Sequence, residues 1–579
     1  MKTKKIIFLS LVLGSCFLLV YFLGNTDKIL LPAELQDTDV SLNIDQEDNR
    51  PPEEEKEKGD TTRYSPRYKS GVQVSFETAN PDSKGSWKCI GPFGIPEVRF
   101  TASGTGAADH VTIHPDNPSI MYLSVRNGGL FRTINHGKHW EPLSDYFCSG
   151  CYCTALCRSQ PDILYMGSED NSIWVTDDAC QSWTLRKNGI TDKVYDIQVD
   201  PNNPDRALAA TLGGLMLTVD RGINWTKVIS GKITDIHVTD NWEHIAVTKN
   251  QTPDQVKPDY LHSTTRGDEW ENVSITDKFE EVSKVYIAFH EPLDGGELLI
   301  YAFLMSDTGA SNIGPTRFIG LFKSVDAGQT FSEITNPRYD YPNGPVLLQN
   351  NNGVFVELND DYGGVNPYTS ATWVSEFYVD PNNPDHLLTM REKFWTSFDG
   401  GQTWQMGPSY GSSNWADNRY CIHNHAKDYL YWCNDGGLWG MAFKNLFPNY
   451  LGREKVNDHI GDLCIQEGSQ CDVSLMNKRV FMTGGQDLGQ FFTRKGRDTH
   501  VGAADVYRGR ICPVNDSLFL TGGLEIKISG YSEDFTLYNN INANHFDGYQ
   551  IFGFTRNSDK LVRSPKGQNA WLTSKNKNE

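Results

Sequence analysis

Two glycine-rich loops carry the acidic residues best placed to do chemistry. Asp435 lies in the run Asn-Asp-Gly-Gly over 434–437, and Asp487 lies in Gly-Gly-Gln-Asp-Leu-Gly over 484–489. Two carboxyl groups roughly 6.5–9.5 Å apart can hydrolyse a glycosidic bond, one as an acid and the other as a base. Acidic residues beside glycine also build turns, so Asp435 and Asp487 are candidates only and the catalytic residues are otherwise unknown.

A pair of histidines precedes the first of these loops. His423 and His425 are two residues apart, which places both side chains on one face of a strand. With Asp435 they could bind a metal ion, or they could pack a sheet edge as neutral polar groups. We predict ligand contacts from His423, His425, Asp435, Gln486 and Asp487. We assign no metal and require no cofactor, with a structural metal as the alternative.

A recurring turn must position these residues. Ser397-Phe-Asp-Gly-Gly-Gln-Thr-Trp404 reads Ser-x-Asp-x-Gly-x-Thr-Trp, and looser copies begin at residues 133, 176, 218, 263 and 324. The Ser and Asp side chains can accept turn N–H groups, Gly takes a conformation that side chains resist, and the aromatic ring enters the core. The residues that we expect to hold these turns are Thr133, Asn135, Gly137, Trp140, Thr176, Asp178, Trp183, Thr218, Asp220, Gly222, Trp225, Ser263, Gly267, Trp270, Ser324, Asp326, Gly328, Phe331, Ser397, Asp399, Gly401 and Trp404.

The spacing of the copies indicates a repeated four-stranded unit. The first four copies begin 43, 42 and 45 residues apart, whereas the later gaps of 61 and 73 call for insertions or a degenerate unit. Units of about forty residues with four strands are typical of propeller blades. The chain is therefore predicted to be all-β, a β-propeller of about ten four-stranded blades, or of seven or eight if some downstream strand pairs are insertions. Residues 86–90 could supply the outer strand of the last blade and close the ring.

The N-terminal region predicts export from the cytoplasm. Lysines at positions 2, 4 and 5 precede an apolar run over 6–24, which is long enough to span a bilayer as a helix. We expect residues 1–26 to be a signal anchor in a single-pass membrane protein whose C-terminal domain lies outside the cytoplasm. A lipoprotein segment with Cys16 as the lipidated residue and a cleaved secretory signal are alternatives. The acidic stretch over 27–84 predicts a disordered stalk, and 85–579 the propeller domain.

Charge and cysteine content limit the partners and cofactors. A formal net charge of −20 disfavours nucleic acid, which requires a basic surface. The cysteines at 148, 151, 153 and 157 form a cluster, those at 421 and 433 flank a hairpin, and those at 464 and 471 are close in sequence. The cluster could bind zinc, but export favours disulfides, whose pairing the sequence leaves open.

The turn motif resembles the Asp-box, or bacterial neuraminidase repeat, and the whole chain from 85 looks similar to sortilin-type (Vps10-like) exported propellers. The resemblance rests on Trp87 to Pro92, the Pro-x-Asn-Pro and Gly-Gly runs, and the segments around His423, Asp435 and Asp487. It implies the propeller fold. The chain lacks the cysteine-rich module of sortilin-type receptors, so a trafficking function is not implied.

Related glycosidases also carry this repeat. The sialidase opening is absent, because Phe93-Gly-Ile-Pro96 lacks its arginine. Xyloglucanase-type enzymes place a carboxylate before a Gly-Gly in the first blade, where this chain has Arg126 and Asn127. We therefore predict a membrane-tethered extracytoplasmic propeller that binds a protein, peptide or glycan ligand without catalysis. The alternative is a glycoside hydrolase that uses two carboxylates and is closer to xyloglucanases than to sialidases.

Overall fold

The computed structural model describes most of the chain from Thr105 onward. The described residues are 105–145, 147–186, 188–249, 259–276, 284–292, 296–306, 317–335, 347–349, 355–357, 376–390, 394–402, 405–406, 415, 417–424, 428–446, 457–463, 465, 468–477, 480–485, 489–494, 497–502, 508–512, 515–522, 526–531, 537–542, 549–554, 561–565 and 572–573. The predicted anchor, the acidic stalk and residues 86–90 lie outside these ranges. No helix within them is long and apolar enough to cross a membrane.

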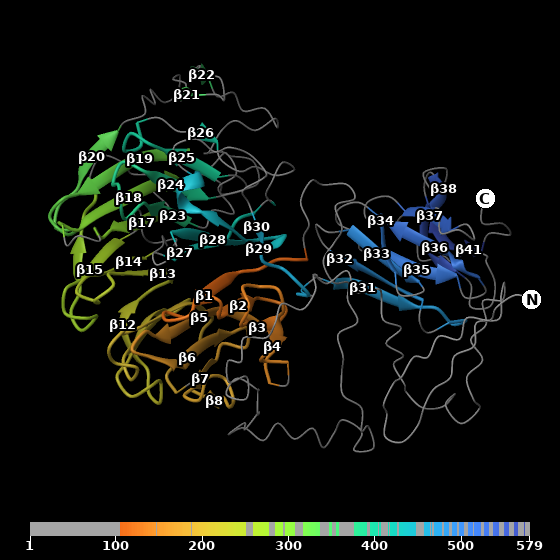
Figure 1. Cartoon of the computed structure of the whole chain (residues 1–579), viewed down its shortest axis with the longest axis horizontal. Coiled ribbons are helices and arrows are strands. Elements are labelled where there is room, and N and C mark those ends of the chain that lie inside the picture. Colours follow the sequence, from red (N-terminus) through yellow and green to blue (C-terminus); the bar gives the residue numbers. More distant parts are fainter. Residues whose placement is uncertain are drawn as a thin grey trace, which may run out of the picture. The chain divides into compact units, whose positions relative to one another are not determined.

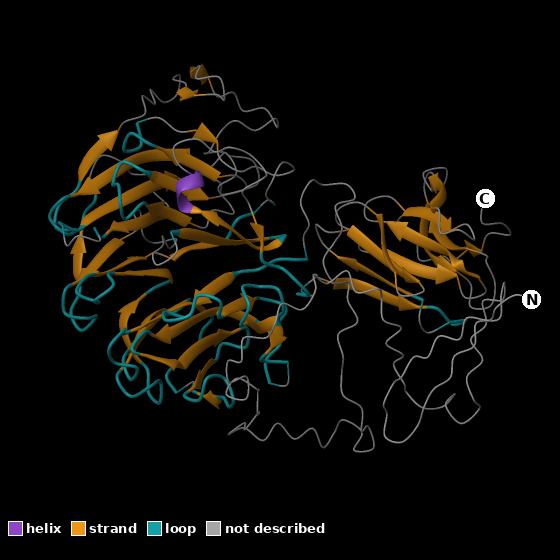
Figure 2. Cartoon of the chain, viewed as in Figure 1, coloured by secondary structure: helices purple, strands orange, loops and turns teal. Residues whose placement is uncertain are grey.

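Seven four-stranded antiparallel sheets follow one another along the chain (Figures 1 and 2). The first comprises β1 (His110–Ile113), β2 (Met121–Val125), β3 (Gly129–Thr133) and β4 (Glu141–Pro142), and the second β5 (Cys151–Cys157), β6 (Gln160–Ser168), β7 (Ile173–Thr176) and β8 (Thr184–Leu185). The third comprises β9 (Val194–Val199), β10 (Ala207–Thr211), β11 (Gly214–Thr218) and β12 (Thr226–Ser230), and the fourth β13 (Ile233–Val238), β14 (Ile245–Lys249), β15 (Asp259–Ser263) and β16 (Glu271–Val273).

The remaining three sheets of this series have the same strand order. They comprise β17 (Lys284–His290), β18 (Leu299–Ser306), β19 (Arg317–Ser324) and β20 (Ser332–Thr335); then β23 (Glu376–Val379), β24 (Leu387–Met390), β25 (Phe394–Ser397) and β26 (Gln405–Met406); and finally β27 (Tyr420–Asn424), β28 (Tyr429–Asn434), β29 (Gly437–Ala442) and β30 (Asn457–Asp458). The short helix α1 (Phe443–Leu446) lies between the last two strands. A hairpin of β21 (Leu347–Gln349) and β22 (Phe355–Glu357) is inserted between the fifth and sixth sheets, which accounts for part of the longest repeat gap.

The seven sheets form a closed β-propeller. The first strand of each of the first five sheets contacts the first strand of the next, and β27 of the seventh contacts β1 of the first. An apolar cluster joins the sixth sheet to the seventh. Apolar clusters fill the spaces between neighbouring sheets; one joins Val111 and Leu123 of the first sheet to Tyr431 and Leu438 of the seventh. Backbone N–H groups of Thr105 and Ala108 complete the closure by donating to carbonyls in the seventh sheet.

This closure changes the expected number of blades from about ten to seven. Because the seventh sheet already packs on the first, the ring has no place for another blade. Three further sheets follow in the chain: β31 (Gly468–Val473), β32 (Phe481–Gly485), β33 (Gly489–Arg494) and β34 (Arg497–Gly502); β35 (Arg508–Cys512), β36 (Asn515–Gly522), β37 (Ile526–Tyr531) and β38 (Leu537–Asn542); and β39 (Tyr549–Phe554), β40 (Leu561–Pro565) and β41 (Leu572–Thr573). From Thr105 onward, the described residues thus form a seven-bladed ring followed by these sheets.

The recurring turns join the third and fourth strands of the first six blades. In each copy the Ser or Thr hydroxyl oxygen accepts the N–H four residues later, as Gly401 N donates to Ser397 Oγ at 2.8 Å. The acidic residue accepts a second N–H, as Ser182 N donates to Asp178 Oδ1 at 2.8 Å. Asn135 and Thr265 replace the acid yet accept the equivalent N–H at 2.9 and 2.8 Å. A side-chain oxygen is therefore what this position requires.

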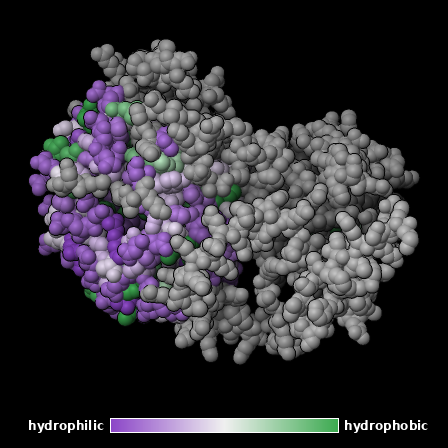
Figure 3. Space-filling view, viewed as in Figure 1, coloured by the Kyte–Doolittle hydropathy of each residue, from purple (hydrophilic) through white to green (hydrophobic). Residues whose placement is uncertain are grey.

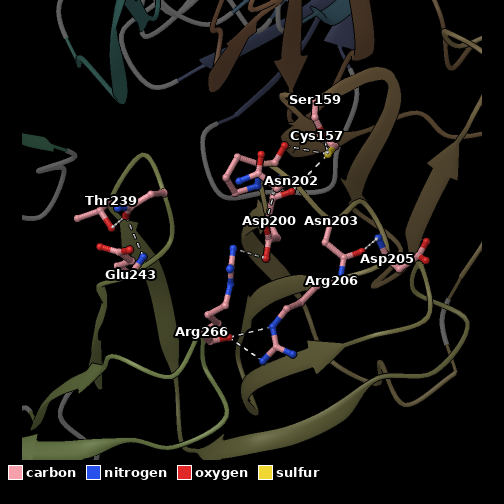
Figure 4. A network of polar contacts seen from close by, with 12 residues as sticks. Cys157, Ser159, Asp200, Asn202, Asn203, Asp205, Arg206, Thr239, Glu243 and Arg266 are labelled. Atoms are coloured by element: carbon pink, nitrogen blue, oxygen red, sulfur yellow. Dashed lines mark hydrogen bonds and ion pairs between the residues drawn. The ribbon is translucent and has the colours of Figure 1, made fainter. Parts of the chain in front are cut away.

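Antiparallel strands give the propeller two distinct faces. We call the face with the recurring turns the motif face; it also carries the turns between the first and second strands. A network on this face links three blades (Figure 4): Cys157 Sγ donates to the Asp200 carbonyl, the Asp200 carboxylate pairs with Arg266 at 2.8 Å, and Arg206 donates to the Arg266 carbonyl. The opposite face, which we call the connection face, carries the links that enter each first strand and the turns between second and third strands.

The cysteine expectation is corrected by the structure. All nine described cysteines are free thiols. Across the β27–β28 ladder Cys421 faces Trp432 and Cys433 faces Tyr420, so the two cysteines occupy neighbouring positions that point to opposite sheet faces. Cys421 packs between the sixth and seventh blades and Cys433 between the seventh and first. Cys464 lies outside the described residues, and no group of residues within them could hold a metal ion.

Candidate functional site

Asp435 lies on the connection face, in the turn between β28 and β29. The turn is shaped by Asn434, whose Oδ1 accepts Gly436 N at 2.9 Å and whose Nδ2 donates to the Trp415 carbonyl. Gly437 takes a φ of 117°. A Cβ on Gly436 would lie 2.1 Å from the Trp415 ring, so the two glycines are required by the turn itself. Asp435 is 5 % exposed.

The carboxylate of Asp435 is paired with Arg419, which immediately precedes β27. The Arg419 guanidinium also donates to Asp109 Oδ1 at 3.0 Å, and Asp109 in turn pairs with Arg126 at 3.0 Å. Burial opposes the charge on Arg419, but the two carboxylates outweigh it and raise its pKa. Asp109 belongs to the first blade and Asp435 to the seventh. The ion pairs therefore join the two blades where the ring closes.

Asp417 is the titratable group beside this ion-pair network. Burial raises the pKa of Asp417 to about 6, and the nearby Asp435 carboxylate and a hydrogen bond with it act in the same direction. The backbone of Asp417 is left-handed, with a φ of 59°. A carboxylic acid and a carboxylate thus lie in hydrogen-bond contact, which is closer than either glycosidase geometry requires.

A second group of charged residues surrounds the ring axis on the connection face. Lys193 Nζ lies 4.1 Å from the ring centroid of Tyr152 and 5.2 Å from that of Tyr195. Arg126 lies 5.2 Å from Tyr152, and Lys232 lies 5.6 Å from Tyr195. All four distances fall within the roughly 6 Å over which a cation is attracted to an aromatic face. We call these five residues the cation–tyrosine ladder; they come from the first four blades.

Acidic and imidazole groups gather on the first strands near the same end. Asp235 pairs with His237 at 2.8 Å, and Asp196 Oδ2 accepts Ile236 N at 3.1 Å. Burial raises the pKa of Asp196 to about 7, with Asp235 adding to the effect, and burial also raises the pKa of Glu376. His110 stacks on Tyr420 with centroids 3.9 Å apart. These side chains share the interior of the ring.

His423 is separated from Asp435 by the structure. It is the fourth residue of β27 and pairs with Leu430, whereas Tyr420 at the other end of that strand lies beside the Asp435 turn. Its ring packs on Phe443 with centroids 4.5 Å apart and on Tyr378 at 6.1 Å, and its Nε2 lies 3.5 Å from Asp428 Oδ1. His423 therefore packs between aromatic side chains at the edge of the sheet, which was the alternative to metal binding.

The other predicted contacts lie elsewhere. His425, Gln486 and Asp487 are outside the described residues. The latter two fall between β32 and β33, in the first sheet beyond the closed ring. Their contacts with a ligand therefore stay a prediction.

The residues that sequence reasoning missed share one repeat position. Asp109, Lys193, Lys232 and Arg419 each immediately precede the first strand of a blade. Aligning the repeats on their first strands, rather than on the conspicuous turns, would have found this charged position. The recurring turns lie on the motif face, whereas these charged residues lie on the connection face.

Comparison with known proteins supports the fold. No family model and no curated protein matches the sequence. The chain is similar in structure to the GH74 enzyme of Niastella koreensis, with a TM-score of 0.53, 14% identity, and coverage of 81% of this chain and 72% of that one. It is also similar to the GH74 xyloglucanase of Xanthomonas campestris (TM-score 0.46, 14% identity, 84% and 81% coverage) and to YCF48 bound to D1 peptide (TM-score 0.37, 15% identity, 58% and 92% coverage). The likeness to the Niastella koreensis enzyme supports the β-propeller fold, and at this identity it supports the fold alone.

Proposed function

We propose that this chain is a non-catalytic binding protein that holds a protein, peptide or glycan ligand on the connection face of its propeller. Loops at one end of a rigid scaffold are common binding sites. The coloured part of the surface in Figure 3 is mainly hydrophilic, with scattered apolar residues. The exposed apolar side chains include Val219 and Val325, which occupy the second position of the recurring turns on the motif face. A ligand on such a surface is recognised by polar and charged contacts.

The observation that carries this proposal is that the candidate carboxylate Asp435 is paired with Arg419, which also pairs with Asp109. A glycosidase needs one protonated carboxyl group and one carboxylate that are free to act on the substrate. Asp109 and Asp435 are each at most 8 % exposed and are engaged by an arginine at the blade junction. Their arrangement stabilises the closed ring.

A two-carboxylate glycoside hydrolase is the second candidate. It is favoured by Asp417, whose pKa of about 6 keeps much of it protonated in mildly acidic solution, next to the ionised Asp435. A raised pKa beside a carboxylate is the pattern of a general acid. The hydrogen bond between the two groups argues against this role, because glycosidases hold their two carboxyl groups at least about 5 Å apart.

The two functions are separated by measuring binding and turnover together. The full chain is applied to a glycan array and incubated with neutral and acidic polysaccharides, beside Asp417→Asn and Asp435→Asn variants. We expect no release of reducing sugar by any of the three proteins. Turnover by the parent chain that is lost in Asp417→Asn would overturn the binding proposal and establish the hydrolase.

The cellular setting is part of the same proposal. We propose that residues 6–24 hold the chain in a membrane with the propeller outside the cytoplasm, on the basis of the basic residues before the apolar run. The resemblance to Asp-box propellers of the sortilin type agrees with export. The cysteines do not add support for export, because the described ones form no disulfide bonds. Membrane fractionation with and without residues 1–26 tests the anchor.

A further inference from the structure

The cation–tyrosine ladder concentrates positive charge on an acidic protein. Cation–π contacts of significant energy occur roughly once per 70–80 residues in proteins. Here four of them link only five residues, in the order Arg126, Tyr152, Lys193, Tyr195 and Lys232. The chain as a whole has a formal net charge of −20. The three cations near the ring axis therefore form a local positive cluster on a protein whose overall charge is negative.

Two of the three cations are available to a ligand. Arg126 is paired with Asp109 at 3.0 Å. Lys193 and Lys232 form no ion pair within the described ranges, and both are half-buried. Their positions are fixed by the tyrosine rings, so little side-chain freedom remains to be lost when an anion binds. The acidic groups near them in sequence are already engaged: Asp192 accepts a hydrogen bond from the Thr191 hydroxyl at 3.0 Å, Asp196 accepts the backbone N–H of Ile236, and Asp235 pairs with His237.

The ring contacts also restrict the type of ligand. Tyr152 has both Arg126 and Lys193 over its ring, and Tyr195 has both lysines. Aromatic faces that are occupied by cations are not free to stack on sugar rings. The two ammonium groups that remain to make contact lie over the same Tyr195 ring, 5.2 and 5.6 Å from its centroid. In an extended peptide, alternate side chains point to the same side roughly 7 Å apart, so two acidic side chains of one segment can pair with these neighbouring cations.

We propose that the cation–tyrosine ladder binds an acidic, extended segment of a partner polypeptide through Lys193 and Lys232. This assignment rests on the proposed binding function and specifies its ligand. The Glu or Asp carboxylates of the segment would pair with the two ammonium groups, and the tyrosines would hold those groups in position. Binding should weaken as ionic strength rises, because the lysines are partly exposed to solvent.

The test measures binding of a fluorescent glutamate-rich peptide of about ten residues to the full chain by anisotropy. Because each charge-assisted contact contributes on the order of a tenfold change in affinity, Lys193→Gln and Lys232→Gln should each weaken binding by about tenfold. Lys227→Gln, which removes the same charge from an exposed outer-strand position, should have no effect. Tyr195→Phe should retain affinity and Tyr195→Leu should reduce it, because only the latter removes the aromatic face.

Each outcome decides between specific alternatives. Equal affinity in the parent chain and the Lys193→Gln/Lys232→Gln double variant would overturn the proposal. Tighter binding of an oligogalacturonate than of the peptide, lost in the same double variant, would overturn the peptide assignment and keep the connection face as a binding site. Polysaccharide hydrolysis that requires Asp417 would instead overturn the proposed function, whatever the peptide result.

Discussion

At the scale of single residues, backbone conformation explains the recurring turn better than its charge does. The residue at the glycine position and the residue before it both have positive φ, as in Gly222 with 75° and Arg221 with 57°. Cys180 occupies the glycine position of the second copy with a φ of 68°. The turn therefore requires left-handed conformation at two successive positions, and glycine is favoured only at the second.

The glycine of the first copy has an additional role, which gives a testable prediction. A Cβ on Gly137 would lie 2.3 Å from the His459 carbonyl oxygen, whereas a Cβ on Gly222 would meet nothing closer than 3.4 Å. Both glycines have positive φ, so alanine costs about 1 kcal/mol at either position. We expect Gly137→Ala to lower the free energy of unfolding in urea by roughly 2–4 kcal/mol, and Gly222→Ala by about 1 kcal/mol. Equal losses would show that the close approach at the blade junction is unimportant.

His110 predicts a dependence of stability on pH. Burial lowers the pKa of His110 from 6.5 to about 3, against a smaller opposing effect of Asp235. Between these values the unfolded chain binds more protons at this residue than the folded one. Its contribution is therefore fully present above pH 6.5 and is lost as the pH falls toward 3. We expect His110→Phe, which keeps a ring against Tyr420, to lose less unfolding free energy between pH 7 and pH 4 than the parent. Parallel pH profiles of the two proteins would contradict this.

At the scale of elements, the junction between the first and seventh blades is stabilised on both faces. On the motif face, Trp140 donates from its backbone to Asp462 at 2.8 Å and from its indole to the His459 carbonyl at 2.9 Å. On the connection face, Arg419 joins Asp109 to Asp435. Adjacent blades elsewhere follow one another directly in the chain, but these two are at its opposite ends in sequence. Side-chain contacts, rather than a continuous stretch of chain, therefore hold the first and seventh blades together.

Removing Arg419 should open this junction on one face. In Arg419→Met, Asp435 would be left buried without its cation, while Asp109 would keep Arg126. Breaking a buried ion pair by removing one partner costs about 3–5 kcal/mol, and we expect a loss of that size in urea unfolding. The double variant Arg419→Met/Asp435→Asn should recover part of it, because the uncompensated charge is gone. A loss below about 1 kcal/mol in the single variant would show that the pair is not needed.

At the scale of the whole molecule, closure after seven blades separates two kinds of sheet. The sheets from β1 to β30 form a ring with apolar clusters between neighbours, including one between the first and the last. The three sheets from β31 onward follow in series, with β31 contacting β35 and β35 contacting β39. The ring is therefore complete without the residues after Ile465, the last one in the cluster that joins the first and seventh blades.

A truncation tests this conclusion. A chain that ends before Gly468 keeps all seven blades, and we expect its ring to unfold cooperatively with a midpoint within a few degrees of the parent's. A chain that ends before Tyr420 loses the seventh blade and exposes the apolar surface of the first. That shorter chain should be largely unfolded or aggregated, as judged by circular dichroism and light scattering. Loss of folding in the longer truncation would show that the C-terminal sheets belong to the folding unit.

The sequence by itself determined the blade. Alternation within strands, the spacing of the turns, and the side-chain oxygens of residues such as Ser397 and Asp399 are local properties, because each depends on neighbours within about forty residues. The four-stranded unit and the turn that recurs within it were therefore predicted correctly.

Only the tertiary structure decided the number of blades and the location of the site. Closure depends on how many sheets fit around one axis, and on contacts such as Arg419 with Asp109, which lie 310 residues apart. The pattern of repeats continues past that point, so it cannot show where the ring ends. The same long-range packing separated Cys421 from Cys433 and His423 from Asp435. It also brought Lys193 and Lys232, ordinary in the sequence, onto the tyrosines beside the ring axis.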